Sequence, residues 1–309
     1  MSIFLPEGKY IDDIVNKSYL KNISSLTDAY NKGIILEARA ISCNLGHDLV
    51  VDLGFCKGII PRCEGAIGID DGTTRDIAII SKVGKPVCFK IVGFNTEGDT
   101  VIPILSRKYA QLSCMENYVS TLKKGDIINA RVTHLEPFGC FVDIGCGIAS
   151  LIPIDCISIS RISHPKDRFV SGQYIKAVVK EIDERGRITL SHKELLGTWE
   201  ENAQLFSSGE TVAGIVRSVE SYGIFVELLP NLAGLAELRE GVEVGDLASV
   251  YIKSLIPEKM KVKLIIVDSF KENYVPTSPI YFVNENHIDQ WIYSPQNSYK
   301  TVQSVFTEE

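Results

Sequence analysis

The 309-residue sequence contains no stretch of about 18 uncharged apolar residues, the length that a membrane-spanning helix needs. Its start, residues 1–10, has neither the basic residues nor the apolar run of a signal peptide. We therefore expect no membrane partner and a cytoplasmic location. The eight cysteines are scattered, without a Cys-x-x-Cys pair or a histidine at ligand spacing, which favours free thiols acting as small hydrophobes over a metal site.

Residues that would form a catalytic centre are also missing. There is no carboxylate cluster of the two-metal type, no Gly-x-x-x-x-Gly-Lys phosphate loop and no defensible Ser/His/Asp set. The sequence thus predicts no catalytic residue, no cofactor and no metal ligand, and we expect a binding protein rather than an enzyme. Hydrophobic residues make up 45% and charged residues 23%, as is ordinary for globular domains, and the length suggests roughly two or three of them.

An excess of positive charge is lacking as well, since the net charge is −7. The charges are unevenly distributed, however. Residues 31–108 and residues 124–196 each carry 10 basic and 9 acidic side chains, whereas residues 208–270 carry 6 and 9. Much of the acidity therefore lies in linkers and tail. Because local charge matters more than total charge for a groove that follows a phosphate backbone, a nucleic acid partner is not excluded.

What the sequence does contain is an internal repeat. Residues 124–193 align with residues 208–268, and a fainter copy occupies residues 31–108. The clearest matching pieces are Gly-Asp-Ile-Ile-Asn-Ala-Arg-Val at 125–132 with Gly-Glu-Thr-Val-Ala-Gly-Ile-Val at 209–216, and Phe-Gly-Cys-Phe-Val-Asp at 138–143 with Tyr-Gly-Ile-Phe-Val-Glu at 222–227.

Each copy reads as short strands, rich in β-branched residues and separated by Gly, Pro or Asp turns. About five strands in roughly 70 residues, with no long helix inside the repeat, favour a small closed barrel, because closure removes exposed sheet edges. Apolar residues at helical spacing between the copies predict short helices as spacers. The predicted parts are an N-terminal helical segment (1–30), a degenerate barrel (31–108), a helical linker (109–123), a barrel (124–193), a second helical linker (194–207), a barrel with a shortened loop (208–269) and a C-terminal tail (270–309).

The middle copy closely resembles the RNA-binding domain of bacterial ribosomal protein S1. The resemblance rests on Gly-Asp-Ile-Ile, Phe-Gly-Cys-Phe-Val-Asp-Ile-Gly, Val-Ser-Gly-Gln and Asp-Glu-Arg-Gly-Arg-Ile-Thr-Leu-Ser. The third copy is similar and the first is a degenerate match. With Trp-Glu-Glu-Asn at 199–202 and Trp-Ile-Tyr-Ser-Pro at 291–295, the whole chain resembles a short, clostridial-type member of that family.

The resemblance implies a mainly β fold of three tandem, small, five-stranded oligonucleotide-binding (OB) barrels joined by short helices. It also implies a ribosomal, RNA-binding ribonucleoprotein component that binds single-stranded RNA, including mRNA. Such a protein would act in translation at the small ribosomal subunit, by stacking and backbone contacts without strong sequence readout.

Two aromatic pairs are the main candidates for the RNA site. Phe138 and Phe141 are three residues apart, so in a regular strand their rings would point to opposite faces. Gly139 between them predicts a bulge that returns both rings to one face, and Tyr222 and Phe225 repeat the arrangement. We expect two platforms on which bases of any sequence can stack. The alternative is that the second ring of each pair belongs to the barrel core.

The resemblance assigns further residues to the same site. Arg187 matches a family arginine beside the rings, and Lys261 is its counterpart in the third copy. Asp183 matches a family surface position in the preceding turn, where the third copy has Pro257. His134, on the first long strand, is included because it lies near the rings, although a lone histidine is more often incidental.

Two departures from the family pattern affect this site. Pro153 stands where many members have a histidine on the third strand, so one stacking or hydrogen-bonding group is missing. The third copy lacks the segment equivalent to 155–168, so its groove must be built differently.

The first copy has no aromatic residue at the platform position, where it offers Leu-Gly-His-Asp at 45–48. In ribosomal relatives the N-terminal modules dock on protein, so we expect residues 31–108 to contact proteins of the small ribosomal subunit. Two alternatives remain for the whole chain. It could be a protein-docking scaffold built of OB barrels, or an accessory that feeds RNA to an exoribonuclease.

Overall fold

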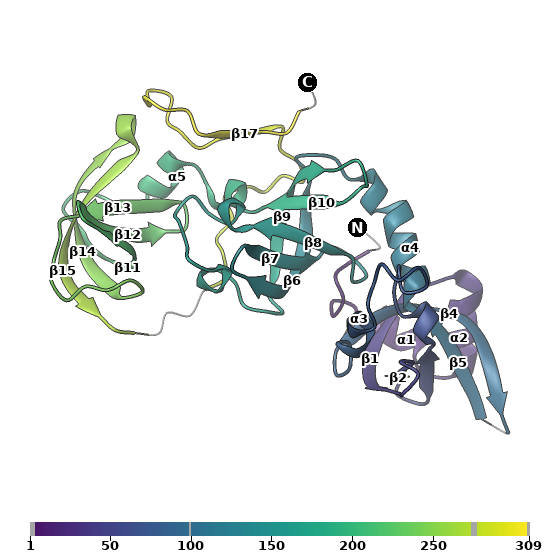
Figure 1. Cartoon of the computed structure of the whole chain (residues 1–309). Coiled ribbons are helices and arrows are strands. Elements are labelled where there is room, and N and C mark those ends of the chain that lie inside the picture. Colours follow the sequence, from purple (N-terminus) through teal and green to yellow (C-terminus); the bar gives the residue numbers. More distant parts are fainter. Residues whose placement is uncertain (1–3, 99, 273–276, 308–309) are drawn as a thin grey trace. The chain divides into compact units, whose positions relative to one another are not determined.

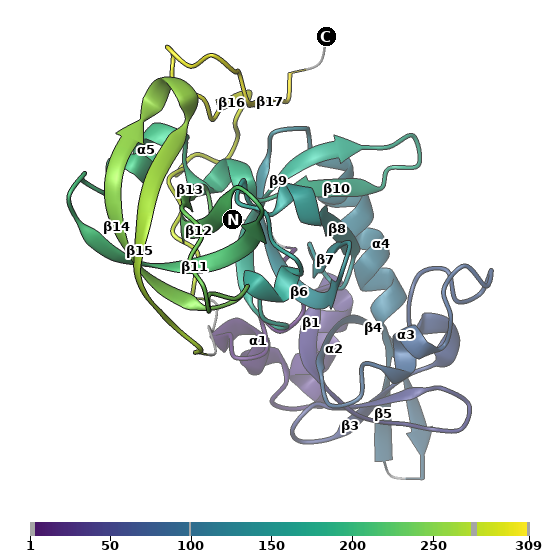
Figure 2. The same cartoon turned by 60° about the vertical axis from the view of Figure 1, so that its left-hand side comes forward.

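The computed structural model describes residues 4–98, 100–272 and 277–307 and divides into two compact units. Unit 1 comprises Met1–Leu122 with Asp143–Ala149, and unit 2 comprises Lys123–Val142 with Ser150–Glu309. Figure 1 colours the elements along the sequence, and Figure 2 gives a second view. Within the described residues, no helix is long and apolar enough to cross a membrane.

Unit 1 begins with two helices and a five-stranded closed barrel, which we call the first barrel. The second helix is capped at both ends, because the Asn22 side chain accepts a hydrogen bond from the Ser25 amide and Gly33 closes the helix in the left-handed region (φ 61°). The barrel strands run in the circular order β1-β2-β3-β5-β4. The elements are α1 (Ile14–Tyr19), α2 (Ile23–Lys32), β1 (Leu36–Cys43), β2 (Leu49–Asp52), β3 (Lys57–Ile60), β4 (Pro86–Glu97) and β5 (Thr100–Ser106).

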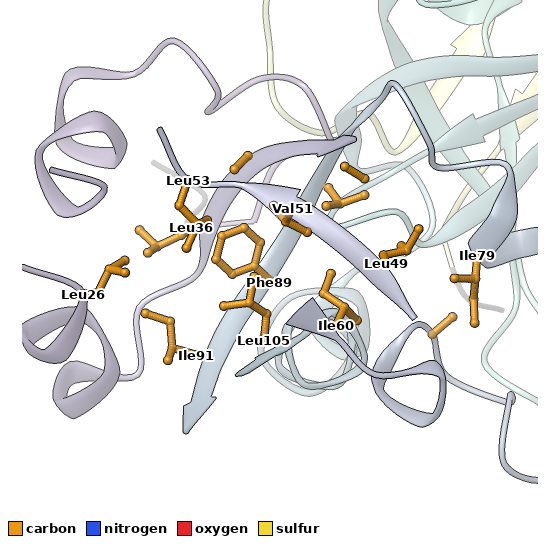
Figure 3. Close-up of a cluster of buried hydrophobic side chains, with 14 of the residues drawn as sticks. Leu26, Leu36, Leu49, Val51, Leu53, Ile60, Ile79, Phe89, Ile91 and Leu105 are labelled. Atoms are coloured by element: carbon orange, nitrogen blue, oxygen red, sulfur yellow. The ribbon is translucent and has the colours of Figure 1, made fainter. Parts of the chain in front are cut away.

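The core of the first barrel is apolar and fully buried. Figure 3 shows the ring of Phe89, from β4, in the middle of a cluster of aliphatic side chains contributed by all five strands and by α2. Leu36, Val51 and Leu105 lie around that ring, and Leu26 brings α2 into the same core. Period-two alternation on the strands places these residues inside.

Short helices complete unit 1. The 3₁₀ turn η1 (Arg62–Glu64) and α3 (Ile77–Ile80) lie between β3 and β4, and α4 (Arg107–Asn117) with η2 (Val119–Thr121) follows β5. At the start of α4, the buried Arg107 guanidinium donates to both carboxylate oxygens of Glu7, at 2.6 and 3.2 Å. This ion pair ties the N-terminal segment to the barrel.

Unit 2 contains two more closed barrels. The second barrel is formed by β6 (Ile127–Glu136), β7 (Gly139–Asp143), β8 (Ala149–Pro153), β9 (Tyr174–Ile182) and β10 (Ile188–Ser191), and the third by β11 (Thr211–Glu220), β12 (Gly223–Leu229), β13 (Leu232–Ala236), β14 (Leu247–Ile256) and β15 (Lys261–Phe270). In every barrel the fourth strand pairs antiparallel with the first and with the fifth, and the third strand pairs with the fifth in parallel. The prediction of tandem five-stranded OB-type barrels is confirmed.

The connections inside unit 2 contain only short helical pieces. Between β8 and β9 the chain forms η3 (Ile154–Cys156) and η4 (Pro165–Asp167), whereas β13 and β14 are joined by a turn without helix. After β10 come η5 (Lys193–Leu196) and α5 (Trp199–Ala203), and η6 (Pro257–Lys259) forms the β14–β15 turn. Gly197, at φ 82°, separates η5 from α5, so the linker is two short pieces and not one helix.

A buried ion cluster joins the second and third barrels. The loop residue Arg168 and the β11 residue Arg217 both bind the Glu227 carboxylate on β12, and all three side chains are at most 9% exposed. Burial would raise the pKa of Glu227, but the two guanidinium groups hold it below its usual value. Asn231 adds hydrogen bonds to the carbonyls of Lys193 and Gly197.

The tail is ordered over much of its length and packs on both barrels of unit 2. Its described part, residues 277–307, contains the hairpin β16 (Gln290–Ile292) and β17 (Gln303–Val305), drawn in yellow in Figure 2. Trp291 and Tyr293 join the core cluster of the third barrel, while Phe306 packs with Val178 and Leu195 of the second barrel and its linker. The sequence had left the structure of this tail open.

Candidate nucleic-acid interface

The second barrel presents two phenylalanine rings next to each other. Phe138 lies in the two-residue turn between β6 and β7 and is 57% exposed, and Phe141 on β7 is half-buried. The ring centroids are 5.9 Å apart and the ring planes are perpendicular, at 89°. Edge-to-face contact of this kind is a favoured aromatic geometry, so the two rings hold each other in place.

The third barrel repeats this ring pair. Tyr222 lies in the β11–β12 turn and is 67% exposed, while Phe225 on β12 is half-buried. Their centroids are 6.1 Å apart with an interplanar angle of 87°. One exposed ring and one half-buried ring, at the same turn and the same angle, therefore occur in both barrels.

The turn, and not a bulge at the glycine, puts both rings on one side. In the third barrel Glu220 pairs with Gly223 and Ser218 with Phe225, and the register shift between β11 and β12 lies earlier, between Val216 and Ser218. The expected bulge between the two rings is thus wrong, because the first ring belongs to the turn and only the second lies in the strand.

The glycine between the rings has a different role. A Cβ atom at Gly139 would lie 2.6 Å from the Ile152 carbonyl oxygen, and one at Gly223 would lie 2.6 Å from the Ala236 carbonyl oxygen. Both distances are shorter than real Cβ atoms allow, so only glycine lets the neighbouring strand approach.

Strand pairing extends each ring pair across the barrel surface. In the third barrel Leu235 pairs with Phe225 on one side and with Lys263 on the other. In the second barrel Leu151 pairs with Thr189 in the same way. Arg187 lies two residues before Thr189, and Lys261 lies two residues before Lys263. The two residues are therefore equivalent, as the alignment of the two copies predicts.

Arg187 and Asp183 form an ion pair with each other. The Arg187 Nε atom donates to Asp183 Oδ2 at 2.7 Å, and the arginine side chain is 74% exposed. Asp183 also accepts from the Arg187 amide, and these hydrogen bonds lower the pKa of its carboxyl. Lys261 pairs with Ile256, so Ile256 stands at the Asp183 position, one residue before the Pro257 that the alignment had placed there.

The last predicted site residue and the position of the missing family histidine are on the barrel strands. His134 is exposed on β6. Pro153 ends β8 and is half-buried, and an exposed carboxylate, Glu237, follows Ala236 at the corresponding place in the third barrel. Sequence reasoning missed Leu151, Leu235 and Lys263, although the Lys-Val-Lys alternation at 261–263 indicates two outward lysines.

The first barrel has no aromatic residue in its β1–β2 turn, and the perpendicular ring pair that it does have, Tyr30 on α2 with Phe94 on β4 (centroids 5.8 Å apart, 81°), lies elsewhere. Leu45, in the β1–β2 turn, is fully exposed, and His47 lies 3.2 Å from the Asp76 carboxylate. Within the residues that the structure describes, no group of metal-ligating side chains is positioned to hold an ion. The β1–β2 turn of this barrel thus lacks the platform found at the corresponding turn of the other two.

Comparison with known proteins agrees with this arrangement. Residues 121–193, the second barrel with its flanks, match the model of the S1 RNA binding domain. The fold and the repeated ring pairs define a protein built of tandem S1-type OB barrels.

The relatives define the family more closely. The chain is 32% identical over 245 residues to a small ribosomal subunit protein bS1 homolog from Bacillus cereus, and 30% identical over 226 residues to bS1 of Staphylococcus aureus. It belongs to the ribosomal protein S1 family. The matches cover 74% and 71% of this chain but 61% and 55% of the relatives, so the chain spans little more than half their length. A crystal structure of a Streptococcus pneumoniae protein with nucleic acid binding domains covers 76% of this chain and 74% of its own, at 16% identity, but its TM-score of 0.25 carries no structural argument.

Proposed function

We propose that the second and third barrels bind single-stranded RNA by stacking unpaired bases on their ring pairs. The observation that carries this proposal is the repeated geometry of an exposed ring and a half-buried ring, perpendicular to each other, at the same turn of both barrels. A scaffold function would need these rings covered. The exposure of Phe138 and Tyr222 supports RNA instead.

The perpendicular geometry limits how a base can bind. A base that stacks on the open face of Phe138 meets Phe141 only at an edge, so each ring holds its own base. Stacking contributes about 1–3 kcal/mol per base and does not distinguish bases, because every base has a π face. The proposed contact is therefore tolerant of sequence.

In the cell, we assign this binding to translation in the cytoplasm, with mRNA captured at the small ribosomal subunit. The names of the two bacterial relatives support the assignment. Residues 31–108 would contact proteins of that subunit, because the β1–β2 turn of the first barrel lacks the aromatic platform of the other two barrels. The chain would act by binding alone, without a reaction of its own.

The test removes one ring pair. Phe138→Ala with Phe141→Ala should lower the affinity for a short unstructured RNA by about 2–4 kcal/mol, as the loss of two stacking contacts predicts. Fluorescence anisotropy at fixed salt measures it, with RNA too short to reach both barrels and with Tyr222→Ala and Phe225→Ala in the background. Tyr109→Ala, an exposed aromatic on α4, is the matched control. A folded ring-pair variant with wild-type affinity would remove the platform from the proposal.

A further inference from the structure

We infer that the third barrel holds the phosphate backbone of RNA on a strip of three lysines, whereas acidic side chains balance the basic residues at the corresponding positions of the second barrel. The strip consists of Lys253, Lys261 and Lys263. The inference rests on the proposed RNA binding and adds a division of roles. Contacts in the third barrel depend strongly on salt, and contacts in the second depend mainly on stacking.

Strand register matches the two barrels residue by residue. On β9 and β10, Glu181 pairs with Thr189 and Val179 with Leu190, so Lys180 is the extra residue of a bulge. On β14 and β15, Ser254 pairs with Lys263 and Ile252 with Leu264, so Lys253 is the extra residue of the same bulge. Lys180 thus corresponds to Lys253, Glu181 to Ser254, Asp183 to Ile256, Arg187 to Lys261 and Thr189 to Lys263.

In the second barrel these positions are electrically balanced. Arg187 is paired with Asp183, and Glu181 faces Thr189. The Lys180 ammonium group lies 3.1 Å from the Cys156 sulfur and close to Asp155, both supplied by η3. The two basic side chains, Lys180 and Arg187, and the two acidic ones, Glu181 and Asp183, give a formal charge of zero.

In the third barrel the same positions carry three basic side chains and no acidic one. All three lysines are exposed, and none of the ion pairs found in the described part of the chain includes them. The short β13–β14 connection has no equivalent of η3, so no loop carboxylate corresponding to Asp155 approaches Lys253. The positive charge of the strip therefore faces solvent.

The strip is continuous with the ring pair. Lys263 pairs with Leu235, which pairs with Phe225, so these three residues form one row across β12, β13 and β15. Acids lie beside the β11–β12 turn, since Glu220 pairs with Gly223 and the exposed Glu237 follows Ala236, which pairs with Ile224. This separation of acidic from basic side chains favours RNA nucleobases near Tyr222 and RNA phosphates near the lysines.

Salt dependence tests the division directly. For single strands, log K falls with log salt by about 0.7 for each phosphate neutralised. Replacing Lys253, Lys261 and Lys263 by Ala should lower the slope by about 2, measured with a short oligouridylate at roughly 50 to 200 mM salt. The control replaces Lys21, Lys57 and Lys85, exposed lysines of unit 1, and changes the net charge equally. Its slope should stay within about 0.5 of wild type.

A reciprocal exchange gives a second readout. Ser254→Glu with Lys263→Thr gives the third barrel the residues that the second has at these two positions, and should flatten the dependence of log K on log salt. Glu181→Ser with Thr189→Lys gives the second barrel those of the third and should steepen it by about 1. Circular dichroism verifies folding of each variant.

The outcomes separate this inference from the proposed function. If the wild-type chain does not bind oligouridylate, RNA binding itself is wrong. If it binds and the strip variants keep the wild-type slope, or the unit 1 control loses as much slope as they do, the lysine strip is refuted while stacking stands.

Discussion

At the scale of single residues, the N-terminal segment depends on one buried ion pair. Burial alone would raise the pKa of Glu7, but Arg107 and Lys82 hold it at about 2. The carboxylate therefore stays charged inside unit 1. A buried charge that loses its partner cannot be rehydrated, so such pairs are costly to break even where they contribute little net stability.

Arg107→Met should accordingly destabilise unit 1 by about 3 kcal/mol, because Glu7 loses its buried guanidinium partner and Lys82 is the one cation among the described residues that still pairs with it. Hydrogen exchange with mass spectrometry measures this as faster exchange of peptides from residues 4–43. Lys32→Ala, which breaks an exposed pair with Asp28, is the control and should change little. Unchanged exchange in the arginine variant would show that the pair is not needed to hold the segment.

The same scale shows what sequence can and cannot say about the site. The equivalence of Phe138 with Tyr222 and of Arg187 with Lys261 followed from the repeat, and the assignment of Arg187 to the site followed from the family resemblance. Their local geometry did not, because a turn and a bulge both place two rings on one side. The Arg187–Asp183 pair, which neutralises the arginine, was also not foreseen, since alignment gives positions and not partners.

At the scale of elements, the strands were predictable and the linkers were less so. β-branched runs between glycine and aspartate turns have a local signal, and the three barrels repeat it. The tail has none, because Trp291 and Tyr293 are fixed by contacts with residues far earlier in the chain. The Tyr293 hydroxyl, for example, donates to the Asn231 carbonyl at 2.6 Å. Non-local packing of this kind leaves no period in the sequence.

His192 is one of the second-barrel residues that the tail contacts, and its environment predicts a pH effect. It is buried, with Phe169 and Tyr281 packed edge-on against its ring, and burial lowers its pKa to about 4. The unfolded chain binds a proton near its ordinary value of 6.5 and the folded chain does not. The stability that neutral His192 contributes to the folded state is therefore complete above pH 6.5 and is lost as the pH falls towards 4.

The free energy of unfolding of unit 2 should fall by about 3 kcal/mol between pH 6.5 and pH 4. Both tryptophans of the chain, Trp199 and Trp291, lie in the core cluster of the third barrel, so urea unfolding followed by tryptophan fluorescence reports on unit 2. His192→Phe removes the titrating group and should flatten the pH profile relative to wild type. Parallel profiles for the two proteins would contradict the assignment to His192.

At the scale of the whole molecule, two stacking barrels on one chain should bind one RNA together. The second contact is then intramolecular, and effective concentrations in the millimolar range raise overall affinity without new interactions. This gain requires RNA long enough to reach both barrels.

A length series tests this cooperation. An unstructured RNA of about 40 nucleotides should bind at least about 100-fold more tightly than one of about 8, which fits a single OB barrel. Removing the ring pair of either barrel should abolish most of the length effect, and removing both pairs should abolish stacking-dependent binding. Equal affinity for short and long RNA would mean that the barrels act separately.

The tail also has a consequence for the order in which the molecule is made. Because Trp291, Tyr293 and Phe306 complete the packing of two barrels that precede them, neither barrel can finish folding until this stretch has emerged from the translating ribosome. Nascent chains stalled before residue 290 should remain sensitive to protease in unit 2, while the first barrel, whose core lies wholly upstream, is already resistant.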